Sequence, residues 1–113
     1  MKTFRIENMK GGWFIGDFLP VAYKTSQFEV GTKLHKKGEK WPMHYHKLGT
    51  EITFLVNGEM IIQDKVLKSG DIFIVEPMEI VNPTFTEDCF VIVIKVPSIP
   101  GDKYCVNMST TSA

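Results

Sequence analysis

The pair Asn57-Gly58 is the feature that most restricts the fold of this 113-residue chain. Asn-Gly is the strongest short-range signal for a two-residue β-hairpin, because both residues tolerate the positive φ angles that the turn requires. It lies between two apolar segments, 52–56 and 59–63, which we expect to be paired antiparallel strands. The centre of the chain is therefore predicted to be β-structure.

Turn residues divide the rest of the chain into short apolar segments as well. None of these segments shows sustained helical periodicity. Segment 28–35 has the alternation of a half-buried strand, with one face made of Phe28, Val30, Thr32 and Leu34 and the other of Glu29, Gly31, Lys33 and His35. Further strands are expected at 13–19, 66–68, 72–75, 80–85 and 89–96.

Short strands between frequent turns are typical of a sandwich or barrel. We therefore predict an all-β fold in a single domain over residues 1–113, which is long enough for one hydrophobic core. The tail 108–113 is small and polar, and we expect it to be disordered.

The charge balance narrows the classes of partner. Thirteen basic and thirteen acidic residues leave no net charge, which argues against nucleic acid and anionic membranes, so we expect a small molecule or another protein. The longest apolar run, 90–94, ends at Lys95, and the N-terminus lacks the apolar core of a signal peptide. Cys89 and Cys105 are too few for a disulfide framework. These features predict a cytoplasmic protein.

His44, His46 and Glu51 form the candidate site. In an extended segment His44 and His46 project from the same face, because side chains alternate with period 2. A turn at 47–50 then allows Glu51 to bring its carboxylate toward the same point. Two nitrogens and one oxygen suit a divalent transition metal such as iron, manganese, nickel or zinc. The alternative for each residue alone is an ordinary surface or core position.

The spacing of these residues resembles the first signature motif of the cupin superfamily. Five residues separate Gly38 from His44, one separates His44 from His46, four precede Glu51, and six more precede Gly58. The resemblance implies a small jelly-roll β-barrel, with His44, His46 and Glu51 as metal ligands and candidate catalytic residues.

The second cupin motif is present only in part. Gly70-Asp71 followed by 72–75 resembles its opening. Where relatives have a proline, a glycine and a histidine, six, eight and eleven residues after the first glycine, this chain has Glu76, Met78 and Val81. The fourth ligand that the resemblance implies is thus missing at Val81.

Three outcomes are open. Metal binds to His44, His46 and Glu51 alone, which leaves coordination positions for substrate or water. Alternatively Glu79, which shares strand parity with Val81, replaces the lost ligand; the other nearby candidates are Glu76, Asn82 and His35. Otherwise the metal is lost and the polar groups bind or protonate a ligand directly, since a histidine near its ordinary pKa and a partly buried glutamate form a workable acid–base pair.

Strand parity also predicts the walls of the pocket. Thr53 and Leu55 share a face with Glu51, and Gln63 is expected to contribute an amide. Trp41 is expected at the entrance, either as a stacking surface for a ligand or as a packing anchor for the turn at 36–39.

Two classes of function follow from the resemblance. The first is an enzyme of the isomerase, epimerase or dioxygenase kind, acting on a small polar metabolite such as a carbohydrate derivative at a divalent-metal site. The second is a non-catalytic, metal-free module that binds a small molecule. The barrel itself does not distinguish them, because one scaffold serves many chemistries.

Several strands are apolar on both faces, which predicts a homodimer. In 52–56, 72–75 and 90–94 the residues that point away from the barrel interior are as apolar as those that point into it. Something must cover this second face. The alternative cover is the N-terminal segment of the same chain, with Trp13, Phe14 and Phe18.

Overall fold

The computed structural model describes residues 1–106, so the tail predicted to be disordered lies outside the described residues. The elements are η1 (Ile6–Asn8), η2 (Lys10–Gly12), β1 (Trp13–Gly16), β2 (Tyr23–Lys24), β3 (Glu29–His35), β4 (His44–Tyr45), β5 (Thr50–Asn57), β6 (Glu59–Ile62), β7 (Lys65–Lys68), β8 (Ile72–Val75), β9 (Thr84–Phe85), β10 (Cys89–Val96) and β11 (Tyr104–Cys105). No helix in this part of the chain has the length and apolar character needed to cross a membrane.

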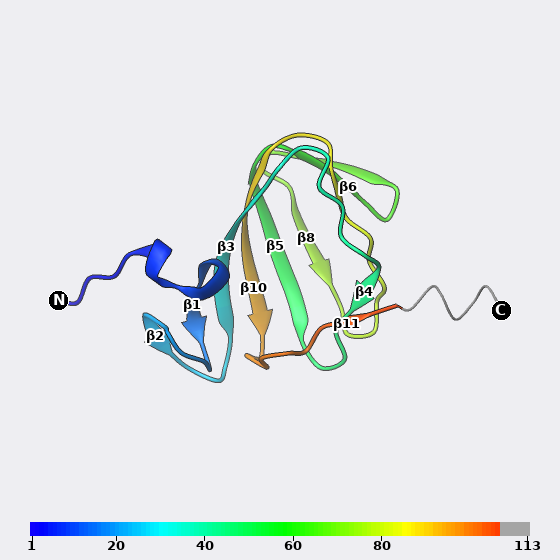
Figure 1. Ribbon diagram of the computed structural model, residues 1–113. Helices are drawn as coiled ribbons and strands as arrows, with labels where there is room; N and C mark the ends of the chain where they lie inside the picture. Colours follow the sequence, from blue (N-terminus) through cyan, green and yellow to red (C-terminus); the bar gives the residue numbers. More distant parts are fainter. Residues whose placement is uncertain (107–113) are drawn as a thin grey trace.

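The strands form two walls of a jelly-roll barrel (Figure 1), which confirms the predicted all-β fold. One wall is a six-stranded sheet in the order β2-β1-β3-β10-β5-β8. The other contains the sheet β7-β6-β9 and the pair β11-β4. The Asn57-Gly58 turn joins β5 to β6 across the two walls, so these strands do not pair with each other and the predicted two-residue hairpin is wrong. Gly58 needs its small size there, because its φ is 111° and an added Cβ would lie 2.4 Å from the Asp88 carbonyl oxygen.

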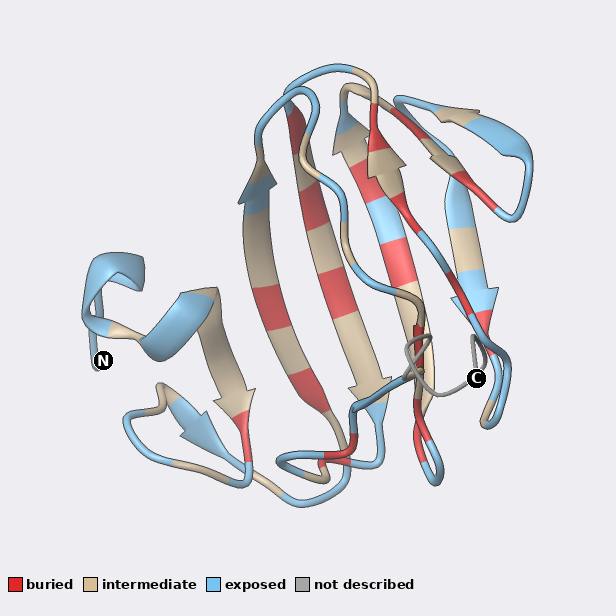
Figure 2. Cartoon of the chain, turned by 45° about the vertical axis from the view of Figure 1, so that its right-hand side comes forward, coloured by how far each residue is buried: buried red, intermediate tan, exposed pale blue. Residues whose placement is uncertain are grey.

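The core lies between the walls. Buried residues alternate with half-buried ones along β10, as the banding in Figure 2 shows. The buried apolar side chains come from both walls: Leu55, Val75, Val91 and Val93 from the large sheet and Met60, Ile62, Val81 and Phe85 from the other. They form one continuous core, as expected for a single domain.

Strand β3 presents its polar face to the barrel interior. Glu29 and Gly31 are buried and Lys33 and His35 half-buried, whereas Leu34 is 78% exposed on the outer face. Gly31 leaves room for the Trp13 indole, since a Cβ there would lie 2.7 Å from Trp13 Cε3. The prediction that this strand is half-buried is confirmed, but its buried face is the one with Glu29, Gly31, Lys33 and His35, and its more apolar face points outward.

The N-terminal segment extends the large sheet. β1 pairs with β3 in antiparallel fashion and β2 pairs with β1 in parallel fashion, so both lie beyond the β3 edge (Figure 1). Trp13 packs against the core side of the sheet. Within residues 1–106, the outer face of β10, β5 and β8 therefore has no cover.

The segment after β10 crosses the end of the barrel and fixes the histidine strand. The buried Asp102 carboxylate accepts hydrogen bonds from the backbone N–H groups of Lys47, Leu48 and Gly49, at 2.8–3.2 Å. β11 then pairs with β4, with Cys105 opposite His44. The turn between β4 and β5 is thus held by a residue more than fifty positions away in sequence.

The strand expected at 80–85 is mostly irregular. Only Thr84–Phe85 is a strand, and Met78 has a φ of 72° in the preceding turn. Val81 nevertheless exchanges both backbone hydrogen bonds with His44, at 2.9 and 3.0 Å. This isolated β-bridge extends the second wall as far as the candidate histidines.

Candidate functional site

A cavity of about 190 Å³ lies between the two walls of the barrel. Its apolar lining comes mainly from Met60, Ile62, Phe73, Phe85, Val91 and Val93. His44, His46 and Glu51 all reach it, from β4, the following turn and β5. The three residues of the first motif therefore share one cavity, as the sequence predicts.

His44 is held as one tautomer. Its Nδ1 lies 3.0 Å from the Pro42 carbonyl oxygen, and because a carbonyl only accepts, Nδ1 carries the proton. The Nε2 lone pair is then free to accept a proton or bind an electrophile. Burial lowers the pKa of His44, and the ammonium groups of Lys103 and Lys95 lower it further, against the effect of the Pro42 hydrogen bond. The imidazole is therefore neutral at neutral pH.

His46 is more deeply buried, with 2% of its surface exposed. Burial, followed by repulsion from Lys95 and His44, lowers its pKa to about 4. Its Nδ1 has no hydrogen-bond partner among the described residues. The sequence predicts a histidine near its ordinary pKa; the structure corrects this, because the site is both buried and positively charged.

Glu51 is the carboxylate of the cavity. It lies opposite Lys95 in the β5–β10 pairing. Burial raises the pKa of Glu51, and Lys95 and Lys103 act in the opposite direction. Its carboxyl group therefore keeps a proton more readily than an exposed glutamate does.

These donors do not form a metal site as the side chains stand. The imidazole centroids of His44 and His46 are 5.8 Å apart and their planes are nearly perpendicular, at 81°. Within residues 1–106 no three His, Cys, Asp or Glu side chains gather into a group that could hold a metal ion. The chemistry of the three donors suits a transition metal but their arrangement does not, so metal binding stays a prediction.

Comparison with known proteins identifies the fold. No protein-family model matches the sequence, and no curated protein is significantly similar to it. An uncharacterized conserved protein with a double-stranded β-helix domain from Klebsiella pneumoniae has a TM-score of 0.65 at 20% identity, over 74% of this chain and 77% of that one. An RmlC-like cupin from Shewanella frigidimarina has a TM-score of 0.63 at 21% identity, over 67% of this chain and 71% of that one. The chain has the cupin fold.

Other similar structures include an enzyme. The DMSP lyase DddQ from Ruegeria pomeroyi has a TM-score of 0.61 at 16% identity, over 74% of this chain and 45% of that one. At these identities the comparisons establish the fold alone.

Val81 stands where the cupin resemblance places the fourth ligand. It is 3% exposed, lines the cavity and bridges to His44. Glu79 does not replace it, because residues 76–79 form a turn in which strand parity no longer applies. Glu79 is exposed, and its Oε1 accepts the Glu76 backbone N–H at 2.7 Å. Glu76 and Asn82 are exposed as well.

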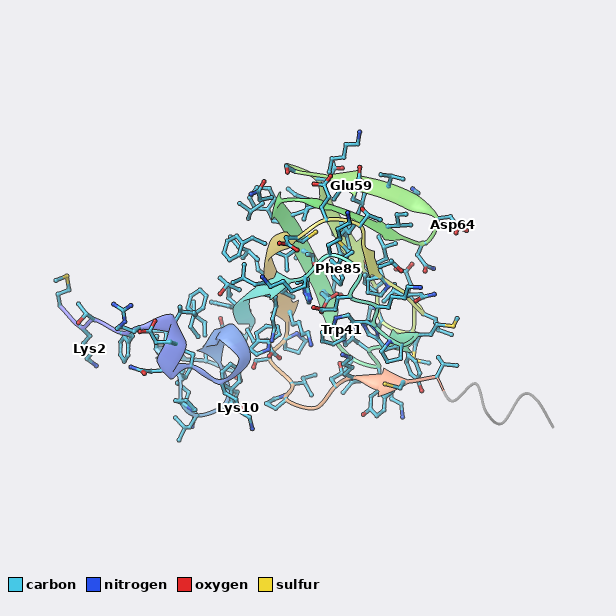
Figure 3. The ribbon with its side chains drawn as sticks, turned by 45° about the horizontal axis from the view of Figure 1, so that its top comes forward. Lys2, Lys10, Trp41, Glu59, Asp64 and Phe85 are labelled. Atoms are coloured by element: carbon cyan, nitrogen blue, oxygen red, sulfur yellow. The ribbon has the colours of Figure 1, made fainter. Side chains whose placement is uncertain are left out.

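Two of the predicted pocket walls are present and two are not. Trp41 and Thr53 line the cavity. Leu55 is fully buried in the core and is not part of the lining. Gln63 is exposed in the β6–β7 turn, with a φ of 50°, and does not line the cavity. Figure 3 shows its neighbour Asp64 at the outer edge of the molecule and Trp41 and Phe85 near the middle.

Trp41 is both an anchor and a wall. Its Nε1 donates to Glu39 Oε2 at 2.7 Å, and the same carboxylate oxygen lies 2.6 Å from His35 Nδ1. The hydrogen bonds with His35 and then Trp41 lower the pKa of Glu39. His35, which also lines the cavity, stacks on Phe85 with ring centroids 4.0 Å apart. Glu39 thus fixes the indole and one wall of the cavity together.

Three lysines of this cupin barrel were missed by the sequence reasoning. Lys33, Lys95 and Lys103 all line the cavity. A signal existed for Lys95, because it has the same parity as Val91 and Val93 at the end of β10. For Lys103 there was none, since its place depends on the crossing of the segment after β10.

Proposed function

We propose that this chain binds a small polar metabolite in the cavity of its cupin barrel, without a resident metal. The observation that carries the proposal is the cavity itself, an apolar space of about 190 Å³ into which His44, His46 and Glu51 reach. A few polar groups gathered in an apolar cavity are the usual anatomy of a small-molecule site. The volume is below the ~300 Å³ of drug-sized sites, which favours a metabolite.

The second candidate is an enzyme of the isomerase, epimerase or dioxygenase kind, with or without metal. The hydrogen bond from His44 Nδ1 to Pro42 favours it, because it leaves Nε2 free as a base or ligand. A glutamate with a raised pKa beside a neutral histidine also provides a donor and an acceptor for a proton. A DMSP lyase with the same fold is consistent with an enzyme.

Metal content separates the metal-free binding protein from a metal-dependent enzyme. Protein purified without a histidine tag would be reloaded with iron, manganese, nickel or zinc, dialysed, and measured by elemental analysis beside a His44→Ala/His46→Ala variant. We expect no more metal in the wild type than in the variant. Near-stoichiometric metal that is lost in the variant would establish His44, His46 and Glu51 as ligands and favour the metal-dependent enzyme.

Ligand binding is tested by a thermal-shift screen of sugars, sugar phosphates and small organic acids. We expect at least one class to raise the Tm, since a ligand that binds only the folded state stabilises it. Thr53→Leu adds volume inside the cavity and should abolish the shift. Thr32→Leu makes the same change on the outer face of the sheet and should leave it intact. A shift that persists in Thr53→Leu would place the ligand elsewhere.

A further inference from the structure

We propose that the ligand of this cavity is a small organic anion, whose carboxylate or phosphate group is held by Lys95 together with Lys33 and Lys103. This inference rests on the proposed function and names the chemical class of its ligand. The inference is drawn from the positions of three lysines, two on strands β3 and β10 and one on the segment after β10.

Lys33 and Lys95 come from adjacent strands of the large sheet. They belong to the inward faces of β3 and β10, in step with the buried Gly31 and Val93. Both ammonium groups lie 5.1 Å from the centroid of the Trp13 ring. One indole therefore carries two cations at its surface, which stabilises each of them modestly but does not neutralise their charge.

Lys103 brings a third cation from the segment that crosses the end of the barrel. Its Nζ lies 3.7 Å from the centroid of the Trp41 ring. Asp102, its neighbour in sequence, is bonded to the β4–β5 turn, so the position of Lys103 is set by a buried anchor rather than by a free tail. The three lysines thus approach the cavity from three separate elements.

The three lysines outnumber the carboxylates in the lining of the cavity. Among residues 1–106, Glu51 is the only acidic residue in the lining, and it lies opposite Lys95. The salt bridges between described residues are Arg5–Glu7 and His35–Glu39, and neither involves these lysines. The Lys33 ammonium group donates a hydrogen bond to the Gly11 carbonyl oxygen. Glu29 lies beside Lys95 in the sheet, but it is not part of the cavity lining, and its carboxylate accepts a hydrogen bond from the Ile99 backbone N–H.

The same groups disturb one another. Burial and then Lys95 lower the pKa values of Lys33 and Lys103, although Glu51 acts in the opposite direction on Lys103. An anion in the cavity would relieve this repulsion, whereas a divalent cation would add to it. The charge distribution therefore favours an anionic ligand over a metal.

The test compares ligands of similar size that differ in charge. Binding of glucose, glucuronate, glucose 6-phosphate and inorganic phosphate would be measured by calorimetry at low salt and at 0.5 M salt. We expect glucuronate or glucose 6-phosphate to bind at least about tenfold more tightly than glucose, with weaker binding at high salt. The carboxylate and phosphate probes show which group the site prefers, and inorganic phosphate shows whether the anion alone suffices.

Variants assign the effect to the lysines. Lys95→Gln and Lys103→Gln should each weaken binding of the anionic probe about tenfold or more, because each removes a charge-assisted hydrogen-bond donor. Lys65→Gln, on the exposed strand β7, is the matched control and should bind as the wild type does.

The outcomes separate this inference from the proposed function. Glucose binding as tightly as the anions, or anion binding unchanged in both Lys95→Gln and Lys103→Gln, would overturn the anion site and leave a small-molecule cavity. No binding of any of the four probes would count against both proposals.

Discussion

Asp102 is the residue on which the position of the histidine strand most depends. It joins the segment after β10 to three consecutive backbone N–H groups of the β4–β5 turn. Burial acts to raise the pKa of Asp102, but the hydrogen bonds from Lys47, Gly49 and Leu48 together lower it below its ordinary value. The charged carboxylate is thus the form that stabilises the fold.

Replacement of this carboxylate should destabilise the protein in a pH-dependent way. Asp102→Asn should reduce the free energy of unfolding by about 1–3 kcal/mol at pH 7, since it removes the charge and one acceptor oxygen. Because the folded pKa is depressed, the contribution of Asp102 is complete above its unfolded pKa of about 3.9 and is lost as the pH falls through the folded pKa. The difference between wild type and variant should therefore shrink below about pH 4.

Urea unfolding followed by tryptophan fluorescence between pH 3 and pH 7 measures this difference. Asp64→Asn, at an exposed turn position, is the control and should change stability little. A stability gap for Asp102→Asn that stays constant down to pH 3 would show that the carboxylate charge is not what holds the turn.

Val81 lies where one substitution should create a better metal site. Val81→His would place a third imidazole across the bridge from His44, in the cavity. We expect Zn²⁺ or Ni²⁺ to bind at least about tenfold more tightly than to the wild type, because nitrogen ligands suit both ions. Calorimetry measures the affinity, and Val81→Asn controls for burying a polar group. A folded Val81→His protein without tighter binding would show that position 81 does not face the donors.

At the scale of elements, the bounds of the central strands were the reliable part of the prediction. The strands from β5 to β8 lie within two residues of their predicted bounds, because turn residues and their flanking apolar residues act locally. The predicted antiparallel pairing of β5 with β6 was wrong, because the fold places these strands in different sheets, and a local turn signal does not determine which strands pair. Gln63 and Glu79 were misplaced because each lies in or beside a turn with positive φ, where alternation along a strand ends.

Strand β3 shows why the site was harder to predict than the fold. Its polar residues face inward because they line a cavity, and its apolar residues face outward. Alternation along a strand defines two faces but does not say which one is buried. Lys33 was missed for the same reason. Lys103 and β11 were missed because the course of the segment after β10 depends on the long-range contacts of Asp102.

The contact between Gly31 and Trp13 ties the N-terminal segment to the cavity. Gly31→Val should destabilise the protein by about 1–3 kcal/mol, because the new side chain overlaps the indole. In a Trp13→Ala background the same substitution should be much less harmful, since the space is then empty. Chemical unfolding of the four proteins gives this double-mutant cycle. An equal loss in both backgrounds would show that the two residues do not interact.

At the scale of the whole molecule, the outer face of the large sheet has no cover within the described residues. Its two central cross-strand rows are Thr32–Ile92–Phe54–Ile72 and Val30–Ile94–Ile52–Ile74. Ile72 is 64% exposed and Ile74 56%. The N-terminal segment, the alternative cover, extends the sheet beyond β3 instead. A contiguous apolar patch of this kind is typical of a protein–protein interface.

We therefore predict that the chain is a homodimer in which two large sheets pack face to face. A twofold axis places the patch of one chain against the same patch of a second copy. Because the chain has no net charge, electrostatic repulsion between the two copies is small. Light scattering behind a sizing column should give twice the chain mass at tens of micromolar. Ile72→Glu/Ile74→Glu should give monomers, because the new carboxylates lose water on association without gaining a partner. Val66→Glu, on the exposed face of β7, should remain a dimer. A wild-type monomer at that concentration would mean that this face meets a different protein.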